Sequence, residues 1–154
     1  MIFREKTRRH ILDLFVELIK FAIVNLRIFM PKLKTKKNEL LEAIVNSIES
    51  IKGNQIISLN FTKIENSICD FFVICSGTSS THVRAIQENV RKKVHKITKQ
   101  KPWNIEEDNK ANWILMDYSN IILHIFQEET RTFYNLEELW GDAKKISYKE
   151  KINE

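Results

Sequence analysis

The most informative hydrophobic pattern is an unbroken apolar run, Phe71 to Cys75, that ends at Ser76 and Gly77. Five apolar residues without polar alternation are typical of a strand covered on both faces, so the run predicts a central strand of an α/β sheet. Gly77 suits the tight turn that follows. The hydroxyl side chains at 78–81 are then placed to cap the start of a helix.

Two stretches show helical spacing. One follows Asn38, a good N-cap residue, and stops near Gly53, which predicts a first long helix. The other begins after Gly77 and runs to about Lys99, which predicts a second. Their apolar stripes consist of Leu41, Ile44, Val45 and Ile48 in the first helix, and of Val83, Ile86, Val90, Val94 and Ile97 in the second.

Short apolar segments predict the remaining strands. Ser119 and Asn120 separate two of these segments and form the kind of two-residue connection that closes a β-hairpin. Short helical pieces follow near 128–133 and 136–140. The predicted strands cover 55–59, 71–75, 103–105, 113–118 and 121–126. Five strands and two long helices indicate an α/β fold.

The predicted hairpin has one apolar face and one mixed face. Two helices cover only one face of a five-stranded sheet, so the mixed face is available to a partner. Alternatively, the segments after residue 127 fold back and cover Trp113 and Phe126, and the pattern allows both arrangements. The apolar face pairs Tyr118 with Ile121, Met116 with Leu123 and Ile114 with Ile125, and the mixed face pairs Asp117 with Ile122, Leu115 with His124 and Trp113 with Phe126.

Residues 1–37 differ from the rest in charge. They hold ten Lys and Arg against three Asp and Glu, a balance of +7, which leaves 15 against 17, or −2, for residues 38–154. Within them, Ile11 to Met30 is apolar but carries too many ionisable groups for a membrane span. Its polar positions recur at helical spacing, which predicts an amphipathic helix.

This extension has two interpretations. It is either a membrane-surface or targeting helix, or a segment upstream of a natural start at Met30 that reflects start-site choice or a private extension, and we favour the second. The chain then divides into a basic N-terminal extension at 1–37, a domain at 38–144 and a C-terminal tail at 145–154.

Charges also segregate within the domain. Residues 84–101 hold seven basic residues and one acid, whereas residues 105–142 hold nine acids and two bases. The acidic half predicts a basic partner. The basic helix suggests RNA binding as an alternative, but such charges are usually a solvated helix face, and no aromatic residues alternate with them to stack on bases.

Cysteine and histidine spacing predicts neither a metal site nor a cofactor. Cys69 and Cys75 match neither a redox pair nor a zinc motif, and we interpret them as reduced packing residues of a cytoplasmic protein. The four histidines are scattered without ligand spacing. We therefore expect no catalytic residues.

These residues resemble the ribosomal silencing factors, also called the Iojap-related family. The resemblance covers 38–144 and rests on D-F-F-V-I-C-S-G-T-S-S-T-H-V at 70–83, K-P-W-N-I-E at 101–106, W-I-L-M-D-Y at 113–118 and H-I-F-Q-E-E-T-R-T-F-Y-N-L-E-E-L-W at 124–140. It implies a mixed five-stranded sheet of nucleotidyltransferase-like topology. It also implies a non-enzymatic protein that binds the large ribosomal subunit through large-subunit protein fourteen. There it would block joining of the small subunit and repress translation under nutrient limitation.

The hairpin and the family pattern together predict the partner-binding residues. Trp113 and Phe126 are the expected anchors, because aromatic side chains at interface centres commonly contribute about 2 kcal/mol or more. The same patch predicts a homodimer of the free protein, and the basic helix predicts a peripheral contact with rRNA. The full predicted set is Trp113, Asp117, Ile122, His124, Phe126, Glu129, Arg131 and Tyr134.

The alternative function is a nucleotide- or RNA-binding module of nucleotidyltransferase-like fold. A Gly-Ser turn that opens a helix is a common place to hold a phosphate. Transfer chemistry also needs clustered carboxylates to bind magnesium, and the chain offers only the isolated Asp70 and Asp117. Thr81 stands where the family commonly has arginine, which weakens a phosphate-binding role.

Overall fold

The structure is a computed structural model that describes residues 37–148. Its centre is a mixed sheet in the order β3-β4-β5-β2-β1-β6, in which β2 and β5 are parallel and the other neighbours antiparallel. The α/β class is confirmed. Along the chain the elements are α2 (Lys37–Glu49), β1 (Asn54–Asn60), β2 (Phe71–Gly77), α3 (Ser80–Thr98), β3 (Asn104–Glu107), β4 (Trp113–Asp117), β5 (Ile121–Gln127), α4 (Glu128–Tyr134), α5 (Leu136–Leu139) and β6 (Lys144–Ser147).

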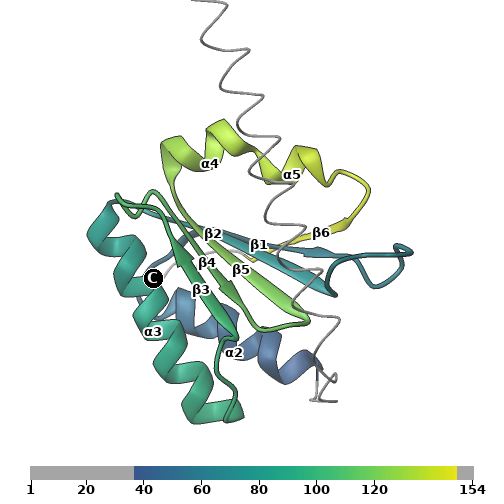
Figure 1. Ribbon diagram of the computed structural model, residues 1–154, viewed down its shortest axis with the longest axis horizontal. Coiled ribbons are helices and arrows are strands. Elements are labelled where there is room, and N and C mark those ends of the chain that lie inside the picture. The colour runs from purple at the N-terminus through teal and green to yellow at the C-terminus, as the bar shows by residue number, and fades with distance from the viewer. Residues whose placement is uncertain (1–36, 149–154) are drawn as a thin grey trace, which may run out of the picture. The chain divides into compact units, whose positions relative to one another are not determined.

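The sheet lies between two layers of helices. Helices α2 and α3 pack on one face, and α4 and α5 lie over the other (Figure 1). The main core forms on the α2–α3 side, where Val73 and Leu123 of the sheet meet Ile44 of α2 and Ile86 of α3, all four with no exposed surface. All seven residues of β2 are buried, which is why its sequence shows no polar alternation.

The prediction of five strands is wrong by one, because β6 adds a sixth. It lies in the segment that the sequence analysis assigned mostly to a tail, and it pairs with the edge of β1. All four of its residues are exposed, so the sequence gives no hydrophobic signal for it. Backbone hydrogen bonding holds it in place, and the next residue, Tyr148, continues the contact by donating its N–H to Ile56 O at 2.9 Å.

Helix α3 begins and ends close to the predicted residues. Ser79 is its N-cap and accepts the N–H of His82, and Lys99 ends it in the left-handed conformation. Four of the five predicted stripe residues are fully buried. Ile97 is not, because it lies in the last turn and is 53% exposed.

The hairpin of β4 and β5 has the predicted register. Trp113 lies opposite Phe126 and Asp117 opposite Ile122. Ser119 takes a positive φ of 73° in the connection, and its N–H donates to Asp117 Oδ1 at 2.6 Å. The side chain of Asp117 therefore helps to fix the turn.

The predicted amphipathic helix at 11–30 lies outside the described residues. Among residues 37–148, none of the helices has the length and apolar content to cross a bilayer.

Candidate functional site

The mixed face of the hairpin forms an aromatic layer on the side of the sheet away from α2 and α3. The rings of Trp113 and Phe126 stack with centroids 4.9 Å apart, and His124 lies 5.7 Å from Trp113. Phe72 of β2 meets His124 edge-to-face at 4.7 Å. Neighbouring strands thus contribute one continuous aromatic surface.

This layer is covered, which decides between the two alternatives that the sequence left open. Tyr134 of α4 packs on Trp113 at 4.8 Å, and Trp140, just after α5, packs on Phe72 at 5.7 Å. Trp113 is 8% exposed and Phe126 not at all. The expectation of an open aromatic face is therefore wrong. Because α4 starts directly after β5, the chain turns back over the sheet and buries apolar area there.

His124 is a structural group in this layer. The indole N–H of Trp113 donates to His124 Nδ1 at 3.2 Å, so the ring proton resides on Nε2, which has no hydrogen-bond partner among the described residues. Burial lowers the pKa of His124 to about 3. The ring is therefore neutral at physiological pH and does not provide a charge for a partner.

Arg131 is also structural, although the sequence predicted contact with a partner. Its Nε and Nη2 donate to Glu137 Oε1 at 2.8 and 2.6 Å, and its Nη1 donates to Gln55 O at 2.8 Å and to Ser76 Oγ at 3.0 Å. The residue is 7% exposed. Arg131 thus fastens α4 to α5, to β1 and to β2.

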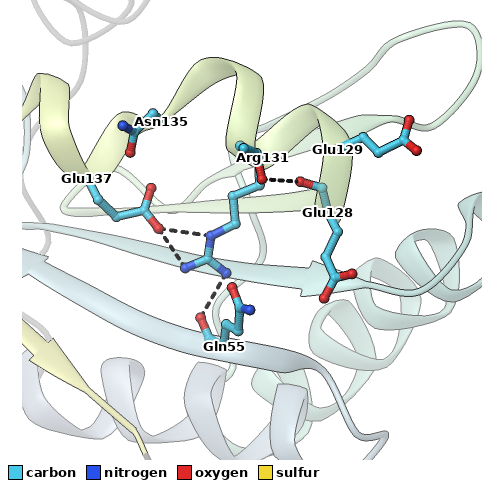
Figure 2. A pocket seen from close by; sticks show the side chains of 7 residues that line it. Gln55, Glu128, Glu129, Arg131, Asn135 and Glu137 are labelled. Atoms are coloured by element: carbon cyan, nitrogen blue, oxygen red, sulfur yellow. Dashed lines mark hydrogen bonds and ion pairs between the residues drawn. The ribbon is translucent and has the colours of Figure 1, made fainter.

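A pocket of about 530 Å³ surrounds this arginine. Figure 2 shows the Arg131 guanidinium held between Glu137 and Gln55, while the side chain of Glu129 points away from it. Three of the seven lining residues are acids and one is a base, and the exposed carboxylates among them suit a cationic group of a partner. The lining residues are Gln55, Glu128, Glu129, Arg131, Thr132, Asn135 and Glu137.

The exposed side of these helices is both acidic and apolar. We call residues 128–142 the α4–α5 cap. Phe133 is 49% exposed and Leu139 53% exposed on it. The cap holds five acids and one base, and that base is the buried Arg131. Phe133 and Leu139 are not among the residues predicted to bind a partner, because the prediction placed the partner on the hairpin face and the sequence does not show which apolar residues of a short helix face water.

The predicted site residues thus fall into two groups. Glu129 is exposed and Tyr134 half-buried on the cap. The buried group consists of Trp113, Asp117, Ile122, His124, Phe126 and Arg131. Contact of either group with a partner stays a prediction.

The turn between β2 and α3, where the alternative function would hold a phosphate, is occupied by the chain's own groups. Thr78 donates its N–H to His82 Nδ1 at 3.1 Å, and Ser79 Oγ accepts the N–H of His82 at 3.1 Å. His82 Nε2 lies 2.9 Å from Ile51 O. The imidazole therefore lies against the turn and uses donors that a phosphate would need.

Residues 37–148 contain no group of three His, Cys, Asp or Glu side chains arranged to hold a metal ion. Cys69 and Cys75 are both buried, Cys69 Sγ donates to Phe71 O at 3.3 Å, and burial raises the pKa of the Cys75 thiol to about 12.

Comparison with known proteins identifies the family. The model of the family described as "Ribosomal silencing factor during starvation" matches residues 34–154. The chain belongs to this family. Ribosomal silencing factor RsfS of Halalkalibacterium halodurans is 39% identical over 105 residues, which are 68% of this chain and 88% of that protein. The chloroplastic Iojap protein of Zea mays is 35% identical over 81 residues, or 49% of this chain and 32% of that protein.

Solved structures show the same fold. A Chromobacterium violaceum protein superposes with a TM-score of 0.64 at 26% identity, over 70% of this chain and 88% of that one. A Bacillus halodurans protein superposes with a TM-score of 0.60 at 34% identity, over 73% of this chain and 99% of that one. The predicted resemblance is confirmed, and with it the assignment to a family of non-enzymatic ribosome silencing factors that regulate translation. Membership implies binding to the large ribosomal subunit.

Proposed function

We propose that this silencing factor binds the large ribosomal subunit through large-subunit protein fourteen and sterically blocks joining of the small subunit. It acts in the cytoplasm and represses translation under nutrient limitation. The observation that carries the proposal is the α4–α5 cap of a chain in this family, because the cap exposes two large apolar side chains among acids.

The chemistry of the cap suits a basic ribosomal protein. Proteins that bind rRNA carry cations to neutralise phosphates, so an acidic surface attracts them and sets the orientation of the encounter. Phe133 and Leu139 supply apolar area that becomes buried on docking, and Glu128 and Glu129 lie beside the pocket as exposed acids. Of the predicted partner-binding residues, Glu129 and Tyr134 make direct contact, whereas the buried ones form the platform that holds the cap in position.

Repression by this route needs no chemistry. A folded domain of the size of residues 37–148 has a radius of gyration of roughly 13 Å. A body of that size at a subunit interface keeps the two surfaces apart, and the cost of removing it is the free energy of its docking.

The test is cosedimentation of the full chain with separated ribosomal subunits. Leu139→Glu places a charge in the centre of the proposed interface, and we expect it to weaken large-subunit binding at least tenfold. Ile146→Glu on β6 is the matched control, because Ile146 is an exposed aliphatic residue of the same domain at 40% exposure. Equal binding of Leu139→Glu and the natural chain would exclude the cap as the docking surface.

The same surface allows self-association. Two copies that pair through Phe133 and Leu139 would each hide the cap from the ribosome, so a dimer of the free protein and binding to the large subunit would compete. We propose the nucleotidyltransferase-like topology for the fold alone and not nucleotide binding, because His82 occupies the β2–α3 turn.

A further inference from the structure

The C-terminal end of α3, from Lys93, and the residues that follow it carry cations that form no ion pair within residues 37–148. Residues 93–101 contain four lysines and no acid. Lys93, Lys96 and Lys99 follow at intervals of three, so they lie along one side of the helix, and all of them are exposed, as is Lys101.

The preceding part of the same helix, residues 84–92, differs, because its cations are paired. Arg84 lies 2.7 Å from Glu107, and both Arg91 and Lys92 contact Glu88, at 2.8 and 3.1 Å.

From residue 93 onward the contacts are uncharged: Lys93 Nζ donates to Ser50 Oγ at 2.6 Å, and Lys99 Nζ donates to Lys96 O at 3.2 Å. Within residues 37–148, none of the four lysines forms an ion pair. The helix dipole favours cations only in the last turn, and this run extends beyond it on both sides.

The fold adds an aromatic side chain to these cations. Trp103 follows Lys101 by two residues, lies immediately before the edge strand β3 and is 43% exposed. Its backbone N–H donates to Asp117 O at 2.6 Å, so its position is fixed while its indole remains open to solvent. The sequence did not indicate that the Trp103 indole is exposed, because Trp103 was predicted to lie in a short strand.

We propose that Lys93, Lys96, Lys99, Lys101 and Trp103, here called the α3 cationic surface, bind single-stranded RNA. The lysines contact successive phosphates and the indole stacks on a base, the combination by which proteins bind single strands with little sequence preference. RNA is favoured over an acidic protein because an exposed tryptophan beside lysines offers a flat stacking surface as well as charge.

This surface is separate from the proposed docking surface. Helix α3 and the α4–α5 cap lie on opposite faces of the sheet (Figure 1). Both can therefore be occupied at once, and a factor docked through its cap would hold RNA on its other side. The inference goes beyond the proposed function and does not need it.

The experiment measures fluorescence anisotropy of a labelled oligouridine of about twelve nucleotides with the full chain, between about 50 and 200 mM salt. The double variant Lys96→Glu, Lys99→Glu should bind the oligouridine at least tenfold more weakly. It should also lower the slope of log affinity against log salt by about 1.4, because each phosphate contact on a single strand contributes about 0.7. The matched control replaces Lys144→Glu and Lys145→Glu on β6, which are exposed and change the net charge equally. Equal losses in both double variants would overturn the site, because net charge alone would then explain binding.

Trp103→Ala tests the stacking. We expect at least fivefold weaker binding to oligouridine with an unchanged salt slope, and near-normal binding of Trp103→Phe. Heparin, a polyanion without bases, should bind Trp103→Ala as it binds the natural chain. Unchanged oligouridine binding by Trp103→Ala, or an equal loss with heparin, would overturn stacking. The assay contains no ribosome, so its failure and that of the Leu139→Glu test are distinguishable.

Discussion

Arg131 and Glu137 form a largely buried ion pair that joins α4 to α5, with Arg131 Nη2 2.6 Å from Glu137 Oε1 and side chains 8% and 17% exposed. The remaining Arg131 nitrogen, Nη1, reaches Gln55 O and Ser76 Oγ on the sheet. One guanidinium therefore connects both helices of the cap to two strands.

Removal of the Glu137 carboxylate should destabilise the domain strongly. Glu137→Ala leaves the charge of Arg131 buried without its counter-ion, which costs about 3 kcal/mol or more in the free energy of unfolding. Urea denaturation measures it. Glu138→Ala is the control, because Glu138 is exposed and its hydrogen bond to Asn135 is at the surface, so that change should cost under about 0.5 kcal/mol. Similar losses in both variants would contradict the role given to the pair.

The lowered pKa of the buried His124 predicts that the folded chain loses stability in acid. Its pKa is about 3 in the folded chain because of burial and near 6.5 when unfolded, so between these values only the unfolded chain binds the proton. The contribution is fully present above pH 6.5 and declines as the pH falls towards 3, by roughly 2 kcal/mol at pH 5. His124→Phe should remove this part of the decline between pH 7 and 5. His95→Gln on the exposed side of α3 should leave it. An unchanged pH dependence in His124→Phe would show that the ring does not resist protonation.

Substitutions at Trp113 and at Leu139 should have different effects, the first on stability and the second on large-subunit binding. Trp113→Ala removes a ring that stacks on Phe126 and contacts Tyr134, and it should cost about 3–5 kcal/mol in stability. Leu139→Glu should change stability little, because half of that side chain is already in water. Thermal unfolding beside cosedimentation distinguishes the two. A stable Trp113→Ala that has lost large-subunit binding would instead make Trp113 a direct contact.

Gly77 should not tolerate alanine. A Cβ at this position would lie 2.9 Å from Val83 Cγ2 and 3.0 Å from Val83 N, so the start of α3 would have to move away from β2. We expect a loss of about 1–3 kcal/mol in the free energy of unfolding. Gly141→Ala is the control, since its added Cβ meets only Glu138 O at 3.4 Å. Equal stability of the two variants would mean that the turn adapts without cost.

Parts of the fold could be predicted because their causes are local. The apolar run of β2, the 3.6-residue stripe of α3 and the two-residue turn at Ser119 each depend on residues close in sequence, and the structure confirms all three, apart from Ile97 at the end of the stripe. Strand β6 could not be predicted in the same way. Its four exposed residues carry no alternation, and only the free edge of β1 makes them a strand.

The chain's sequence by itself determined the α/β class, the register of the hairpin and membership of the ribosomal silencing factor family, because periodicity and motif are properties of the chain. Only the tertiary structure decided which apolar groups face water. Trp113 and Phe126, the predicted anchors, are covered, whereas Phe133, Leu139 and Trp103 are exposed. The physical reason is that burial depends on what packs from elsewhere in the chain: the return of α4 over β5 closes one aromatic surface and leaves other side chains outside.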